Sequence, residues 1–228
     1  MSQPSRSRAE SIADPPRPTV NFDNAFRAQL RDLLVWRRDV RHFRRDPLPG
    51  GTLEALIDLA CLAPSVGLSQ PWRFVIVESE ARRAAIRENF QVCNAAALAA
   101  QSEERASRYA RLKLAGLEAA PGHLAVFADR STAQGHGLGR HTMPEMIEYS
   151  AVTAMHTIWL AARAQGIGTG WVSILDPQAV VALLDVPPEW KFIGYFCLGY
   201  PQADSVTPEL EQSGWECRRS PSSVTIRR

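Results

Sequence analysis

The sequence predicts a globular fold that mixes helices with a sheet and departs from a plain doubly wound pattern. Four short runs rich in β-branched and aromatic residues alternate with longer helical patterns. Two helical segments precede the first of these runs, whereas a doubly wound α/β fold usually begins with a strand. Hydrophobic residues make up 45% of the 228, which is enough for one large domain with a substantial core.

The first helix is predicted over 24–37, because Phe26, Leu30 and Leu34 recur at helical spacing with arginines between them. Residues 1–20, rich in Ser, Arg and Pro, are predicted to be a disordered tail before a domain that spans 21–228 with a C-terminal extension. A second helix is predicted over 52–62.

Beyond residue 70, strands and helices alternate. The last apolar run is almost free of polar residues and is therefore predicted to be a central strand. The polar tail after Pro201 lacks periodicity. The predicted strands are 72–77, 123–129, 170–175 and 191–200, and the predicted helices are 81–119 (with a break near Cys93 or Gln101), 143–165 and 177–184.

Composition excludes several classes of protein. A net charge of +2 argues against a nucleic-acid binder, which usually carries a dense basic face. No apolar run is long enough to span a bilayer, and the N-terminus lacks the apolar region of a signal peptide. The cysteine usage predicts a reduced, cytoplasmic location. None of the four cysteines forms a CxxC pair, and Cys61 and Cys197 lie in apolar runs that predict core positions.

The glycine-rich loop at 135–139 follows a predicted strand, but its third glycine is misplaced for a dinucleotide-binding fingerprint. His136 and His141 have no cysteine or carboxylate at metal-ligand spacing, so no metal site is predicted.

The segment Arg37-Arg38-Asp39-Val40-Arg41 crowds three arginines around the end of the first helix. Guanidinium groups bind phosphate through a forked arrangement of donors, so this segment is a candidate phosphate site. Taken by composition alone, a solvated basic helix end, favoured by the helix dipole, explains the same residues more simply.

Two further segments combine small and hydroxyl residues with turns. The connection 63–72 (APSVGLSQPW) supplies free N–H and O–H donors between a helix and a strand, and such a turn can approach a ring or a phosphate. The stretch 166–173 (GIGTGWVS) places glycines at a strand entry, where the backbone can come close to a ligand. An ordinary prolyl connection and an ordinary helix cap explain the two segments equally well.

Together and in this order, the three segments resemble the flavin-dependent nitroreductase family, over about residues 26–200. The resemblance implies an α+β fold with a central, mostly antiparallel sheet flanked by helices, in an intertwined homodimer that binds FMN at the subunit interface. It implies that Arg37, Arg38 and Arg41 grip the phosphate and ribityl chain. Pro64, Ser65 and Ser69 then line the flavin ring, in part from the partner subunit.

Val40, Trp171 and Ser173 complete the set of candidate flavin-binding residues, together with one C-terminal arginine. Arg218 is named as that candidate, and the choice between Arg218 and Arg219 stays open. Two positions depart from the common family pattern. Asp39 stands where a small donor is usual, and Leu68 stands where asparagine is usual. A carboxylate next to a phosphate is repelled at close range, so Asp39 is expected to serve proton transfer instead.

The form RRDVR, the run GWVSILDP and the segment GRHTMPE at 139–145 are similar to one branch of the family, which fragments flavin. There, reduced FMN is the substrate and is cut with dioxygen to 5,6-dimethylbenzimidazole, the lower ligand of cobalamin, and erythrose 4-phosphate. The resemblance implies that Asp39 is a base or proton relay near the ribityl carbon. Ser173 is then the hydroxyl that orients the reacting edge of the ring. Part of 81–119 is expected to serve as a lid.

The electron source stays open between NAD(P)H used directly and a separate flavin reductase. Two other functions compete with flavin fragmentation. One is an NAD(P)H-dependent nitro- or quinone reductase of the same fold, with FMN as a recycled cofactor. The other is a non-catalytic flavin-binding module, suggested by the arginine-rich ends and the polar tail. No nucleic acid or membrane partner is expected.

Overall fold

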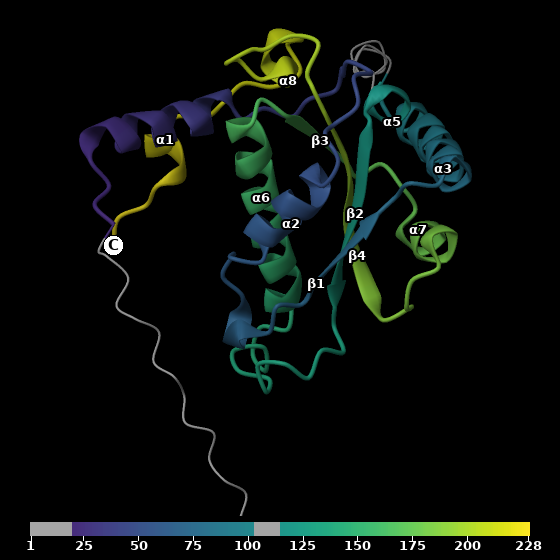
Figure 1. Ribbon diagram of the computed structural model, residues 1–228, viewed down its shortest axis with the longest axis horizontal. Coiled ribbons are helices and arrows are strands. Elements are labelled where there is room, and N and C mark those ends of the chain that lie inside the picture. Colours follow the sequence, from purple (N-terminus) through teal and green to yellow (C-terminus); the bar gives the residue numbers. More distant parts are fainter. Residues whose placement is uncertain (1–19, 103–114) are drawn as a thin grey trace, which may run out of the picture.

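Among the described residues, four antiparallel strands form the central sheet (Figure 1), in the order β1-β2-β4-β3. The computed structural model describes residues 20–102 and 115–228. The strands are β1 (Trp72–Ile76), β2 (Gly122–Asp129), β3 (Gly168–Val172) and β4 (Trp190–Gly199). The predicted tail at 1–20 lies, apart from Val20, outside the described residues.

Helices cover both faces of this sheet. Their bounds are α1 (Asn24–Trp36), α2 (Thr52–Ala60), α3 (Glu80–Ala99), α5 (Gly116–Ala119), α6 (Met146–Ala164), α7 (Pro177–Leu184) and α8 (Glu209–Gln212), with short 3-10 turns η1 (Val66–Leu68) and η2 (Pro221–Val224). In Figure 1, α2 and α6 lie on one side of the strands, while α3, α5 and α7 lie on the other. Within the described ranges, no helix has both the length and the apolar content of a membrane span.

Successive side chains of β2 point alternately into two hydrophobic clusters, one on each face of the sheet. Leu124 and Val126 point into the cluster that α2 and α6 cover, whereas Ala125 and Phe127 point into the cluster that α3 and α7 cover. Because successive strand side chains face opposite sides, a strand buried on both faces is apolar throughout. The prediction that the last strand is central is confirmed, since β4 lies between β2 and β3.

The predicted elements are present, and their ends differ from prediction by a few residues. Helix α3 ends at Ala99, close to the predicted break at Gln101, and the part of the predicted helix at 103–114 lies outside the described residues. Strand β3 is shifted to Gly168–Val172, so Ser173 follows the strand instead of lying inside it. The prediction of a core position for Cys61 is wrong for a single chain, where the residue is exposed, while Cys197 is buried.

The shift of β3 towards its glycines has a physical reason. The segment after α1 runs along the free edge of β3, where Asp39 forms a parallel bridge with Thr169. The Val40 N–H donates to the Thr169 carbonyl at 3.1 Å. A Cβ atom on Gly170 would lie 2.2 Å from the Val40 carbonyl oxygen, so only glycine admits this approach.

This close approach generates a prediction. Gly170→Ala is expected to lower the free energy of unfolding by about 1–3 kcal/mol, because backbone at the sheet edge must move to admit the methyl group. Chemical denaturation measures the change. Gly50→Ala is the matched control, because a Cβ there meets nothing within 4 Å. Equal stability of the two variants would contradict the tight pairing at the edge of β3.

Candidate functional site

The arginine-rich segment begins where α1 ends. Arg37 is the C-cap residue and adopts extended backbone, which turns the chain towards the edge of β3. Its guanidinium lies 4.8 Å from the ring centre of Trp159 on α6, within the range of a cation–π contact. The same Trp159 donates its indole N–H to the Arg38 carbonyl at 3.2 Å. One aromatic side chain therefore holds both the backbone and the side chains of this turn.

The C-terminal segment brings a third arginine to Arg37 and Arg38. Burial lowers the pKa of Arg37, and the positive charge of Arg218 lowers it further, against the opposing effect of Asp39. Burial and Arg218 likewise lower the pKa of Arg38. Residues 20–102 and 115–228 contain no acid that forms an ion pair with any of these three arginines.

Neutralisation of this cluster is incomplete. Arg38 donates to two backbone carbonyls, those of Val206 and Arg37. The Nε atom of Arg37 is buried and has no hydrogen-bond partner in the described part of the chain. A buried donor without an acceptor is costly, so the geometry calls for an acceptor. Clustered guanidiniums with a free donor fit an anion that has several oxygens, such as a phosphate.

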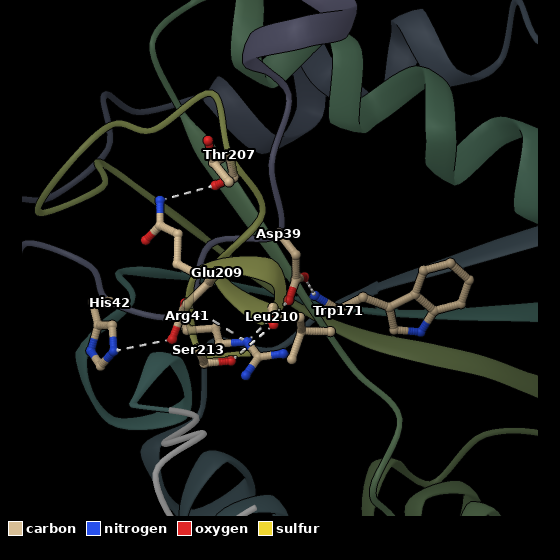
Figure 2. A network of polar contacts seen from close by, with 9 residues as sticks. Asp39, Arg41, His42, Trp171, Thr207, Glu209, Leu210 and Ser213 are labelled. Atoms are coloured by element: carbon tan, nitrogen blue, oxygen red, sulfur yellow. Dashed lines mark hydrogen bonds and ion pairs between the residues drawn. The ribbon is translucent and has the colours of Figure 1, made fainter. Parts of the chain in front are cut away.

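Asp39 and Arg41 form a separate group (Figure 2). The Asp39 carboxylate accepts a hydrogen bond from the Trp171 backbone N–H at 2.9 Å, and its other oxygen lies 3.5 Å from Nε of Arg41. The same Nε atom lies 3.9 Å from the carboxylate of Glu209 on α8. Arg41 is therefore engaged by two acids, whereas Arg37, Arg38 and Arg218 form no ion pair within the described residues.

Asp39 combines access to a cavity with partial desolvation. A cavity of about 290 Å³ is lined by Asp39, Arg38 and Glu209 among others, and 36% of the Asp39 side chain is exposed. Desolvation by the surrounding protein raises the pKa of Asp39, and the Trp171 N–H and Arg41 oppose this rise. A raised pKa brings a carboxyl closer to the pH at which it can exchange protons during catalysis.

The turn at 63–72 is held in a strained backbone. Gly67, Leu68 and Gln70 all have positive φ, a region that non-glycine residues rarely adopt. Asparagine tolerates this region better than leucine, so the Leu68 departure keeps the conformation at a cost. A strained backbone persists only where surrounding contacts hold it in place, and such strained residues are common at ligand sites.

Several hydrogen bonds hold the turn in this conformation. Ser65 Oγ accepts from the Gln70 N–H at 3.1 Å, and the Val66 N–H donates to Ser150 Oγ on α6 at 3.0 Å. The Pro64 carbonyl accepts from Thr153. Ser69 is buried, and its hydroxyl has no partner in the described residues.

Within one chain, the two predicted halves of the flavin site are not brought together. The turn at 63–72, here called the Ser65 turn, contacts α6 at Ser150. The segment 37–41, here called the arginine turn, contacts α6 at Trp159. These positions are roughly 13 Å apart along a helix that rises 1.5 Å per residue. Figure 1 shows η1 and the end of α1 at opposite ends of α6.

The remaining predicted residues lie around the edge of β3. Val40 packs against the second core cluster, and Trp171 meets Trp159 edge to face, with ring centres 6.3 Å apart. Ser173 is exposed just beyond the end of β3. Among the described residues, no group of three His, Cys, Asp or Glu side chains could hold a metal ion.

Two residues at the site were missed by sequence reasoning. Trp159 occurs in an apolar helical pattern, where packing is the simplest interpretation of a tryptophan. Glu209 lies in the polar tail and meets Arg41 only because the chain returns after β4. Neither contact leaves a local signal, because each joins segments that are far apart in sequence.

An α+β fold of this kind, with helices on both faces of an antiparallel sheet, recurs in known proteins. The model of the nitroreductase family matches residues 34–200. A solved structure of iodotyrosine deiodinase bound to FMN and 3-iodo-L-tyrosine is 25% identical, with a TM-score of 0.65, over 77% of this chain and 91% of that one. The chain belongs to the nitroreductase family.

Closer relatives locate the chain within that family. A 5,6-dimethylbenzimidazole synthase of Rhodospirillum rubrum is 60% identical, over 87% of this chain and 94% of the relative. A 5,6-dimethylbenzimidazole synthase of Rhodobacter capsulatus is 47% identical, over 86% of this chain and 95% of the relative. The expected branch of the family is thereby confirmed, and with it the α+β fold.

The arginine cluster predicts an anion site that depends on Arg218. Inorganic phosphate is expected to raise the melting temperature of the wild type, by the equivalent of roughly 1.4 kcal/mol at ten times its Kd. Arg218→Gln is expected to lose most of this stabilisation, because one of the three guanidiniums is gone. Thermal unfolding in phosphate against chloride at equal ionic strength measures it.

Arg219→Gln is the matched control for Arg218→Gln, since it removes the neighbouring charge. It is expected to keep the response to phosphate. An equal response of all three proteins would mean a general salt effect, and Arg218 would then have no part in the site.

Proposed function

We propose that the protein is a 5,6-dimethylbenzimidazole synthase, which fragments reduced FMN with dioxygen to dimethylbenzimidazole and erythrose 4-phosphate. The observation that carries the proposal is the placement of a partly desolvated carboxylate, Asp39, next to a cationic cluster that forms no ion pair within the described residues. The names of relatives at 60% and 47% identity support the same reaction.

The residues present fit reduced FMN as the substrate. The phosphate is bound by Arg37, Arg38 and Arg218. Within the described residues, no ion pair neutralises these three arginines. The buried Nε donor of Arg37 also needs an acceptor. The flavin supplies the electrons that activate dioxygen, and the protein supplies binding, orientation and proton transfer. Arg41, shared between two carboxylates, serves Asp39 more directly than it serves the phosphate.

Asp39 has the role of a general base at the ribityl end of the substrate. Its Oδ1 is fixed by the Trp171 N–H, so the Oδ2 atom is the one that remains for proton transfer, with Arg41 beside it. Ser173, exposed at the end of β3, supplies a hydroxyl that orients the reacting edge of the ring. NAD(P)H or a flavin reductase provides the electrons.

A cytoplasmic location suits this reaction, because reduced flavin requires a reducing compartment. The four cysteines are all free thiols, which fits such a compartment.

The assignment of Asp39 is tested by Asp39→Asn. The variant is expected to bind FMN within about threefold of the wild-type Kd, since the arginines remain, and to lose product formation at least about a hundredfold. Asparagine keeps an oxygen for the Trp171 N–H, so the edge of β3 stays paired. Aerobic incubation with reduced FMN, followed by mass spectrometry of dimethylbenzimidazole, measures the product.

Asp46→Asn is the matched control, because Asp46 forms an exposed pair with Arg44 away from the cavity, and it is expected to keep full activity. Parallel loss of binding and product in Asp39→Asn would make the residue structural. Simple reoxidation of FMN by the wild type, with no dimethylbenzimidazole, would sink the proposed function and favour a reductase of the same fold.

The active form is a homodimer in which the Ser65 turn of one subunit reaches the arginine turn of the other. Two observations support this arrangement. The two turns are separated along α6 within one chain, and α1 has no buried residue although it carries several large apolar ones. Its exposed apolar side chains are Phe26, Leu30, Leu34, Val35 and Trp36. Exposed apolar surface of this kind typically marks an interface.

The dimer is tested by Leu34→Glu on α1. A charge on this face is expected to produce monomers in sedimentation experiments and to weaken FMN binding by more than about tenfold, because each site loses its partner turn. Val92→Glu is the matched control, since Val92 is also an exposed apolar helix residue but lies on α3. A Leu34→Glu monomer that binds FMN normally would contradict the shared site.

A further inference from the structure

A second carboxylate faces the arginine turn from the C-terminal segment. Glu209, the first residue of α8, lies 3.9 Å from Nε of Arg41 and 4.0 Å from Nε2 of His42 (Figure 2). Its side chain is 36% exposed, the same fraction as that of Asp39. Arg41, at 12% exposure, is thus enclosed between two acids that approach the same guanidinium nitrogen.

This arrangement affects Asp39 in two ways. A carboxylate that competes for Arg41 draws part of the guanidinium charge away from Asp39, and its own negative charge acts on Asp39 through space. Both effects favour the protonated form of Asp39. The pKa of Asp39 is raised chiefly by desolvation, and Glu209 is a further raising influence that opposes the Trp171 N–H and Arg41.

We infer that Glu209 is a positioning residue that acts through Arg41 to keep the Asp39 carboxylate basic enough to accept a proton. The inference rests on the proposed function, because it assigns Glu209 a part in the base chemistry of Asp39. Within the described residues, the ion pairs of Glu209 are with Arg41 and His42 and with none of the three arginines of the anion cluster. Its effect is therefore confined to proton transfer and leaves phosphate binding intact.

Other charged and titratable groups also face Asp39, and they come from the end of α1, from the turn itself and from β4. Arg37 faces it from the end of α1 and Arg41 from the turn itself, while the Cys197 thiol lies on β4. His42 lies beyond Glu209. A pH profile that reports Asp39 must therefore separate the contribution of Glu209 from those of Arg37, Cys197 and His42, which one substitution at 209 leaves in place.

The first experiment measures Asp39 directly and needs no turnover. Protein labelled with carboxyl-¹³C aspartate is titrated by NMR, and the Asp39 signal is assigned by its loss in Asp39→Asn. Glu209→Gln is expected to lower the pH of half-ionisation of Asp39, because a nearby like charge is removed. Glu209→Asp keeps the charge and is expected to titrate like the wild type.

The second experiment follows product formation against pH with reduced FMN. In Glu209→Gln, the acid limb is expected to shift to lower pH by the same amount as the NMR titration, because Asp39 ionises earlier. The plateau kcat is expected to fall about threefold to tenfold, since the base is weaker, and KM to stay within about twofold. Glu216→Gln, which removes a carboxylate of the same segment that accepts from the neighbouring Cys217 N–H, is the control.

Superimposed titrations of Asp39 in the wild type and Glu209→Gln overturn the inference. The inference is equally overturned if Glu209→Asp and Glu216→Gln shift as far as Glu209→Gln, because the effect would then be a general disturbance of α8. Absence of dimethylbenzimidazole from the wild type would instead end the proposed function, and the NMR titration would still decide whether Glu209 controls Asp39.

Discussion

The pairing of the arginine turn with the free edge of β3 is the constraint on which the rest of the site depends. The Val40 N–H donates to Thr169, and the Trp171 N–H, which an edge strand would otherwise leave unpaired, donates to the Asp39 carboxylate. The same contact completes the sheet and orients the proposed base. Asp39 thus has a structural role beside its proposed chemical one, and this role accounts for a carboxylate directly next to Arg38.

The arginines near this edge of the sheet differ in their ion pairing. Arg41 lies between Asp39 and Glu209, while Arg37, Arg38 and Arg218 crowd together without forming ion pairs with any acid of the described residues. Like charges held together in a partly buried place oppose folding unless an anion joins them. In the proposed function, the ion-paired Arg41 serves proton transfer and the arginines without an ion pair serve the anion, although Arg38, Asp39 and Arg41 line one cavity.

Much of the fold could be predicted from the sequence, because strands and helices leave local periodic signals. The central β4 and the small-residue face of α6 were predictable on that basis. The bounds of β3 were not, since Gly168 and Gly170 have little strand propensity and pair only because Val40 needs close approach. At the site, the arginine segment was a candidate from its residues and Asp39 was singled out through family resemblance. Trp159 and Glu209 make contacts between distant segments that no local pattern reveals.

The separation of the two turns along α6 has a genetic consequence. Where each catalytic centre draws one turn from each subunit, an allele damaged at Ser65 and an allele damaged at Arg37 can rescue each other. A mixed pair of subunits assembles one centre from two intact turns and a second centre from two damaged ones. Cells that carry both alleles would retain up to half of the centres in every mixed pair, although neither allele supports the pathway alone.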